Sequence, residues 1–247
     1  MVDTGARATS LTRLFLMCAA AAGPAFITVF LLEGARRDGY QQLRHPVSAL
    51  SLGPDGWAQV TSFGATGMMY VAGGVGLCRV PDPVKPARLG PALIGAAGLG
   101  LIGSAMFATE PVSGYPPEAL GASGSLDRPE SKDVPLAHDA AMTRHGIAAI
   151  PMVMGLPLAA LAYAWRFHRH GNRRWAGYSS AAAASMSANF VLAAAGFGQH
   201  RRLVHVAGLF QRASIISAFA WITALALRAL DGLPRIDQGQ MRSQHDS

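Results

Sequence analysis

The sequence predicts an all-α protein, an integral membrane bundle of six transmembrane helices with both the N- and the C-terminus in the cytoplasm. Hydrophobic residues make up 51% of the 247-residue chain and charged residues only 14%, against about 25% charged residues in a soluble domain. Six apolar segments each approach or exceed the ~20 residues that cross a bilayer as a helix. The basic residues lie in short clusters between these segments, a pattern typical of the cytoplasmic flanks of membrane helices.

We expect three parts along the chain. A short cytoplasmic N-terminus covers residues 1–13, the transmembrane domain covers 14–227, and a polar, disordered cytoplasmic tail covers 228–247. The predicted spans are 14–32, 58–78, 89–109, 146–164, 176–197 and 205–227. A cleaved signal peptide is the competing interpretation of the first segment, but signal cores usually have only about 7–15 apolar residues. The 19 uncharged residues favour an uncleaved span, which Pro24 bends.

The connecting segments predict the orientation. Residues 79–88 and 165–175 are short and basic, and two tryptophans bracket the second of them, as suits a membrane interface. Residues 110–137 form the longest loop, which is rich in Gly, Ser and Pro. With the N-terminus inside, inner segments hold twelve of the 21 Lys and Arg residues, whereas the longer outer segments hold eight. The positive-inside rule therefore favours this orientation.

The segment His45–Trp57, HPVSALSLGPDGW, is the least hydrophobic part of the first third of the chain. Its prolines, glycines and serines are typical of a specified turn-rich segment. We expect it to form an interfacial or re-entrant cap, with Trp57 at the level of the lipid head groups. Ser48 lacks the GxSxG surroundings of a nucleophile, so a role in the turn is favoured.

Three segments resemble a known family. They are His45–Trp57 with the following Phe63 and Gly67, then FATEP over Phe107–Pro111, and GLFQRASIISAFAW over Gly208–Trp221. Together they are similar to the prokaryotic multi-pass membrane proteins catalogued as domain of unknown function 998, over about residues 14–227. The resemblance implies a six-helix bundle in a prokaryotic cytoplasmic membrane and no established activity.

Arg212 is the most informative single residue, because it lies seven residues into the last predicted span. An arginine in lipid costs at least ~2.5 kcal/mol unless it is paired. We expect it to face the bundle interior and to meet an acid or backbone carbonyls, with Glu33 and Glu110 as the candidate acids. This predicts an outward-facing polar pocket roofed by His45–Trp57. Its candidate residues are Glu33, His45, Ser48, Trp57, Glu110, His138 and Arg212, with His205 as an additional lining residue.

Outer-side histidines form the basis of a second hypothesis. His138 and His145 are seven residues apart, so a helix places both on one face. Together with His205 they are candidate ligands of a metal ion or a haem. No HExxH or comparable spacing is present, so histidines that simply lie at the membrane interface are the simpler interpretation and no cofactor is the expectation.

The sequence leaves three functions open. The first is a non-enzymatic membrane protein that binds or moves a small or lipidic ligand, and the second is a metal- or haem-dependent membrane enzyme. The third is a structural or assembly partner, for example a homo-oligomer. Small residues at every fourth position favour close helix packing; they are Ala92, Ala96, Gly100, Ser104 and Ala108 in the third span and Gly177, Ala181, Ser185, Asn189 and Ala193 in the fifth. The partners expected are the bilayer and such a ligand, not nucleic acid, because no clustered basic face is present.

Overall fold

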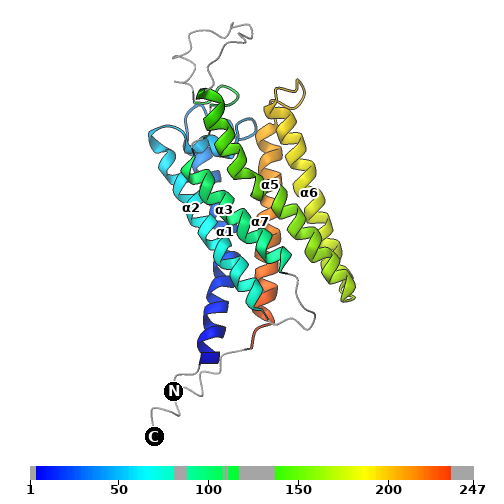
Figure 1. Ribbon diagram of the computed structural model, residues 1–247. Helices are drawn as coiled ribbons and strands as arrows, with labels where there is room; N and C mark the ends of the chain where they lie inside the picture. Colours follow the sequence, from blue (N-terminus) through cyan, green and yellow to red (C-terminus); the bar gives the residue numbers. More distant parts are fainter. Residues whose placement is uncertain (1–3, 81–87, 108, 110, 117–136, 235–247) are drawn as a thin grey trace.

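The structure, a computed structural model, describes residues 4–80, 88–107, 109, 111–116 and 137–234. Six long helices run roughly along one axis (Figure 1). They are α1 (Thr4–Arg36), α2 (Trp57–Arg79), α3 (Leu89–Met106), α5 (Ala137–Arg169), α6 (Arg173–Phe197) and α7 (Ala207–Asp231). Over the described residues the protein is all-helical, with one isolated β-bridge between Val112 and Tyr115 and no strand. The predicted helical class is therefore confirmed.

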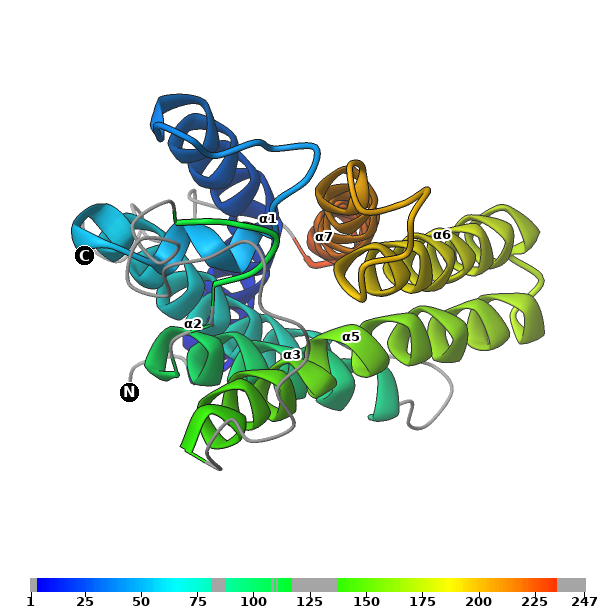
Figure 2. The same cartoon turned by 90° about the horizontal axis from the view of Figure 1, so that it is seen from above.

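The helices form a closed ring, which Figure 2 shows from above. Each helix packs against its neighbours in the chain, in the order α1, α2, α3, α5, α6 and α7, and α7 closes the ring against α1. The Arg13 guanidinium donates to the Pro234 carbonyl at 2.9 Å, so the beginning of α1 and the end of α7 lie at the same end of the bundle. Closure of the ring creates an interior that all six helices face.

Two kinds of contact hold the ring together. An aromatic cluster joins three helices: the ring centroid of Phe26 in α1 lies 5.3 Å from those of both Phe63 in α2 and Phe219 in α7. Glycines permit close approach elsewhere. A Cβ atom on Gly67 of α2 would lie 2.6 Å from the carbonyl oxygen of Gly98 in α3, so the two backbones are in contact. Gly100 likewise faces α5, since its Cβ would lie 2.6 Å from the Ala148 carbonyl oxygen.

Small residues predicted in the third and fifth spans thus form contacts between helices of one chain. Gly100 packs against α5, and in α6 the Ser185 hydroxyl lies 2.8 Å from that of Ser217 in α7. Asn189 donates to the Ser185 carbonyl of its own helix at 2.9 Å. Ala108 lies outside the described residues.

Five of these helices are long and apolar enough to cross a membrane: α1, α3, α5, α6 and α7. The sequence predicted six such spans. α2 is not in this group, although its 23 residues correspond to about 35 Å of helix. Its five glycines and its polar residues lower its hydropathy; the polar ones are Gln59, Thr61, Ser62 and Thr66. The structure thus supports a membrane protein with five helices of membrane-spanning character.

The segment before α2 forms two short 3₁₀ helices, η1 (Val47–Ser51) and η2 (Pro54–Gly56). Gly53 between them adopts a φ of 77°, a left-handed conformation that favours glycine. The Ser51 hydroxyl donates to the Ser48 carbonyl at 2.7 Å. η1 packs against α1, α2 and α7, so the turn-rich segment is a built part of the bundle end, as its sequence predicted.

Candidate functional site

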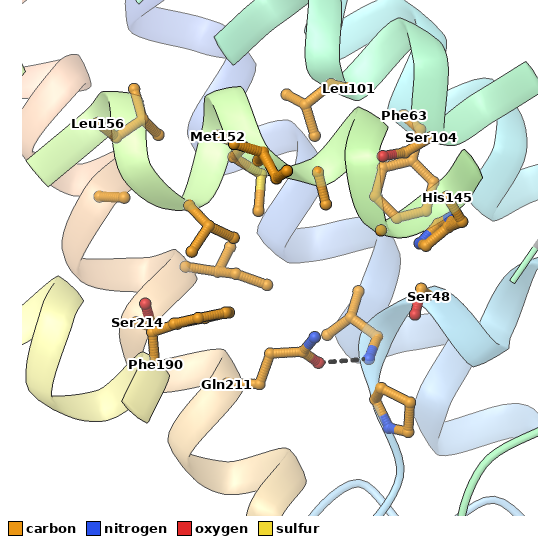
Figure 3. Close-up of a pocket in the computed structure, with 18 of the residues that line it drawn as sticks. Ser48, Phe63, Leu101, Ser104, His145, Met152, Leu156, Phe190, Gln211 and Ser214 are labelled. Atoms are coloured by element: carbon orange, nitrogen blue, oxygen red, sulfur yellow. Dashed lines mark hydrogen bonds between the residues drawn. The ribbon is translucent and has the colours of Figure 1, made fainter. Parts of the chain in front are cut away.

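A cavity of about 590 Å³ lies inside the ring of helices (Figure 3). Every long helix contributes to its wall: Phe26 from α1, Phe63 from α2, Leu101 from α3, Leu156 from α5 and Phe190 from α6, for example. α7 adds several residues, which are Gln211, Ser214, Ile215, Ala218 and Phe219. Residues 46–48 cover one end. Its volume lies within the ~300–1,000 Å³ usual for small-molecule sites.

The wall of this cavity is mainly apolar, whereas the sequence predicted a polar pocket. None of its described lining residues is Lys, Arg, Asp or Glu. Of the candidate pocket residues only Ser48 lines it, together with His145 from the predicted metal set. The difference has a physical reason: Arg212 binds backbone carbonyls of the loop between α1 and α2, and Glu33 pairs with Arg37, so these side chains hold the loop and do not line the cavity.

Polar side chains gather at one end of the cavity. In Figure 3, Ser48, Ser104 and His145 lie on the same side, away from Met152 and Leu156. Gln211 is held beside Ser48, because the Val47 amide donates to its Oε1 at 2.7 Å. The Nδ1 atom of His145 lies 2.9 Å from the Phe107 carbonyl oxygen, which fixes the ring between α3 and α5. Ser214 lies on the opposite side, beside Phe190, but its hydroxyl donates to the Met186 carbonyl at 2.8 Å, so the polar groups that stay open lie toward one end of a mainly apolar cavity.

Arg212 lies next to this end but points into the loop that precedes η1. Its guanidinium donates to the carbonyls of Gln42, His45 (3.1 Å) and Gly208 (3.0 Å), and to the Tyr40 hydroxyl at 2.6 Å. It is only 5% exposed. Arg212 thus meets carbonyls, one of the two kinds of partner that the sequence predicted.

The predicted acidic partners of Arg212 are placed elsewhere. Glu33 forms an ion pair with Arg37 at 3.6 Å, and Arg37 also donates to the carbonyls of Leu52 (3.0 Å) and Leu50 (3.1 Å). Glu110 lies outside the described residues. Two arginines, 37 and 212, therefore tie the loop between α1 and α2 to the helices.

Three rings surround the Arg212 network on the loop side. The centroids of Tyr40, His45 and Tyr115 lie between 5.1 and 5.5 Å apart. Burial raises the pKa of the Tyr40 phenol, an effect that the nearby Arg212 charge opposes. The neutral phenol donates to the Pro46 carbonyl at 2.9 Å. Tyr40 consequently links the arginine to the segment that roofs the cavity.

His45 is a structural residue of this network. Its Nδ1 accepts from the Gln41 amide at 3.0 Å, while its carbonyl accepts from Arg212. Burial lowers the pKa of the imidazole below its ordinary value of 6.5, a hydrogen bond with the Ser113 backbone raises it, and the charges of Arg44 and Arg212 lower it further. The fold therefore favours the neutral ring, which holds residues 41–45 and 113–115 together.

The remaining predicted residues lie apart. Trp57 begins α2 and is 69% exposed, and His205 is exposed in the turn before α7. His138 is in the first turn of α5, and its side chain lies outside what the structure describes. Among the described side chains, no group of three or more His, Cys, Asp or Glu residues is placed to hold a metal ion. The metal or haem site involving His138 stays a prediction.

Sequence reasoning missed two residues of the site. Gln211 lines the cavity and accepts from the Val47 amide. The Tyr40 hydroxyl accepts a hydrogen bond from Arg212. Gln211 directly precedes Arg212 in the sequence, so a polar pair within an apolar span was the available signal for it. No sequence signal distinguished Tyr40, since its role depends on where the loop folds back.

The fold and this site define a class, an all-helical membrane protein whose helices enclose an apolar cavity with one polar end. The chain belongs to the family described as "Protein of unknown function (DUF998)", which matches residues 20–228. The resemblance predicted from three segments is thereby confirmed. No match was found among curated proteins or among solved structures.

Proposed function

We propose that all six long helices cross a prokaryotic cytoplasmic membrane, with both termini in the cytoplasm. α2 lies in the ring between α1 and α3, which both have membrane-spanning character, and its length suffices to cross. Arginines are also denser at the ends of the helices that lie with the beginning of α1. Those are Arg7, Arg13, Arg79, Arg88, Arg166, Arg169, Arg173, Arg174 and Arg228, against Arg36, Arg37, Arg44, Arg144, Arg201 and Arg202 at the other end.

Single cysteines test this topology in a variant whose Cys18 and Cys78 are replaced by alanine. We expect Asp55→Cys to react with a membrane-impermeant maleimide in intact spheroplasts, and Val80→Cys and His170→Cys to react only after permeabilisation. Equal labelling of positions 55 and 80 in intact spheroplasts would show that α2 does not cross. Labelling of positions 80 and 170 but not of position 55 in intact spheroplasts would show the opposite orientation.

We infer that the protein binds a lipidic ligand inside the ring of helices. The observation that supports this most strongly is the cavity itself, a space of about 590 Å³ that all six helices line and that is apolar except at one end. An apolar molecule with a small polar group gains from such a site, because its apolar surface is buried while its polar group finds hydrogen bonds.

The cavity is also accessible from the side that faces lipid. Ile150 and Met154 of α5 line it, yet they are 53% and 52% exposed. These side chains therefore form the boundary between the cavity and the outer surface of α5. We infer that a ligand dissolved in the bilayer enters here, between helices and without crossing water, which fits a lipid better than a water-soluble metabolite.

Filling the cavity tests the proposal. We expect Ala149→Trp to reduce, at least severalfold, the amount of lipid that copurifies with the protein in detergent and is counted by native mass spectrometry. The matched control is Leu158→Trp, which adds a similar side chain on the same helix at an exposed position that does not line the cavity. Equal copurified lipid in both variants and the wild type would contradict binding in the cavity.

A further inference from the structure

The polar end of the cavity has hydrogen-bonding capacity that the protein does not use. The Oε1 atom of Gln211 accepts from the Val47 amide, and its Nε2 has no partner among the described residues. The Ser48 side-chain hydroxyl likewise has no partner in the described part of the chain. By contrast, the other serines that line the cavity use their protons: Ser104 donates to the Gly100 carbonyl and Ser214 to the Met186 carbonyl.

The chemistry of these open positions can be assigned atom by atom. The Phe107 carbonyl can only accept, so Nδ1 of His145 is the donor in the hydrogen bond between them. The Gln211 Nε2 can only donate. Ser48 can do either. A polar group bound here can therefore accept from the Gln211 Nε2 and donate to the Ser48 hydroxyl, as a hydroxyl does, whereas an ester or ketone oxygen can only accept.

The lining of the cavity also excludes an anionic head group. No described lining residue is a lysine or an arginine, which would compensate a phosphate or a carboxylate. Arg212 is the nearest buried cation to Gln211 in the sequence, and its Nη atoms are occupied by three carbonyls and the Tyr40 hydroxyl. Burying an anion without a partner is strongly unfavourable. An anionic head group would thus be rejected at this end.

From this arrangement we propose that the ligand is a lipid with an uncharged, hydroxyl-bearing head, bound by Ser48, His145 and Gln211 with its apolar tail directed toward Leu156 and Phe190. The inference rests on the proposed lipid binding and specifies the class of head group. It also assigns specificity to Gln211 and Ser48, which the Val47 amide and η1 hold at the roof of the cavity.

Three probes that carry the same oleoyl chain test which head group the site prefers. They are 1-oleoylglycerol, its 3-phosphate, and methyl oleate, each titrated into the delipidated full-length protein and followed by native mass spectrometry. We expect 1-oleoylglycerol to bind at least tenfold more tightly than either of the others. Methyl oleate can accept but not donate, and the phosphate carries charge.

Two variants then test where the head group binds. Gln211→Glu keeps an oxygen for the Val47 amide but removes the donor, and Ser48→Ala removes the hydroxyl. Each should weaken binding of 1-oleoylglycerol roughly three- to tenfold, the loss of about one hydrogen bond. The matched controls Gln199→Glu and Ser187→Ala, at exposed positions outside the cavity, should bind as the wild type does.

The outcomes separate the two proposals. Equal or tighter binding of the phosphate, or wild-type binding by Gln211→Glu and Ser48→Ala, would overturn the head-group assignment. In either case lipid binding that Ala149→Trp abolishes would leave the proposed function intact. Failure of all three probes to bind a protein that also copurifies with no lipid would overturn both.

Discussion

Replacing Arg212 with alanine is expected to lower the free energy of unfolding by at least ~3 kcal/mol, because hydrogen bonds to charged groups contribute about 1.5–3 kcal/mol each and this guanidinium donates to three carbonyls and a phenol. The Gln42 carbonyl would lose its donor, and the His45 carbonyl would keep only the Tyr40 hydroxyl at 3.3 Å. Titration with sodium dodecyl sulfate in mixed micelles, followed by circular dichroism, measures the change.

The control for this prediction is Arg202→Ala, which removes an exposed arginine from the turn before α7. We expect it to change stability by less than ~0.5 kcal/mol, as is usual for exposed positions. Arg212→Lys should fall between the two, since an ammonium group keeps the charge but lacks the planar fork of donors. Equal stability of Arg212→Ala and Arg202→Ala would show that the network does not brace the bundle.

The second large effect is expected at the contact between α2 and α3. In Gly98→Ala the added Cβ would lie 2.5 Å from the Gly67 carbonyl oxygen and 2.8 Å from the Val71 amide nitrogen. Both neighbours are backbone atoms, so the helices must separate. We expect a loss of about 3 kcal/mol, at the upper end of the cost of overpacking, measured by the same unfolding titration.

Gly95→Ala provides a matched control in the same helix. A Cβ at position 95 would have no atom within 4 Å, and alanine favours helix over glycine by up to about 1 kcal/mol. Stability should therefore stay unchanged or rise slightly. If both substitutions destabilised the protein equally, the cause would be the helix backbone of α3 and not its contact with α2.

The environment of Arg212 shows which part of the site could be predicted from the sequence. A charge within an apolar span predicted a buried residue with a partner, and Arg212 is buried and bonded. The acids named as its partners lie 179 and 102 positions away in the chain. Only the folded loop between α1 and α2 could show that carbonyls and the Tyr40 hydroxyl take their place.

Apolar length and the spacing of basic clusters by themselves determined that this chain is all-helical and belongs in a membrane, because a bilayer admits only segments of sufficient length that satisfy their own backbone. Three segments, His45–Trp57 among them, predicted the family to which the chain belongs. The tertiary structure alone decided that the helices close into a ring and that the ring encloses an apolar cavity. The physical reason is that side chains facing lipid and side chains facing a cavity are both apolar, so no periodicity in the sequence separates the inner face of a helix from its outer face.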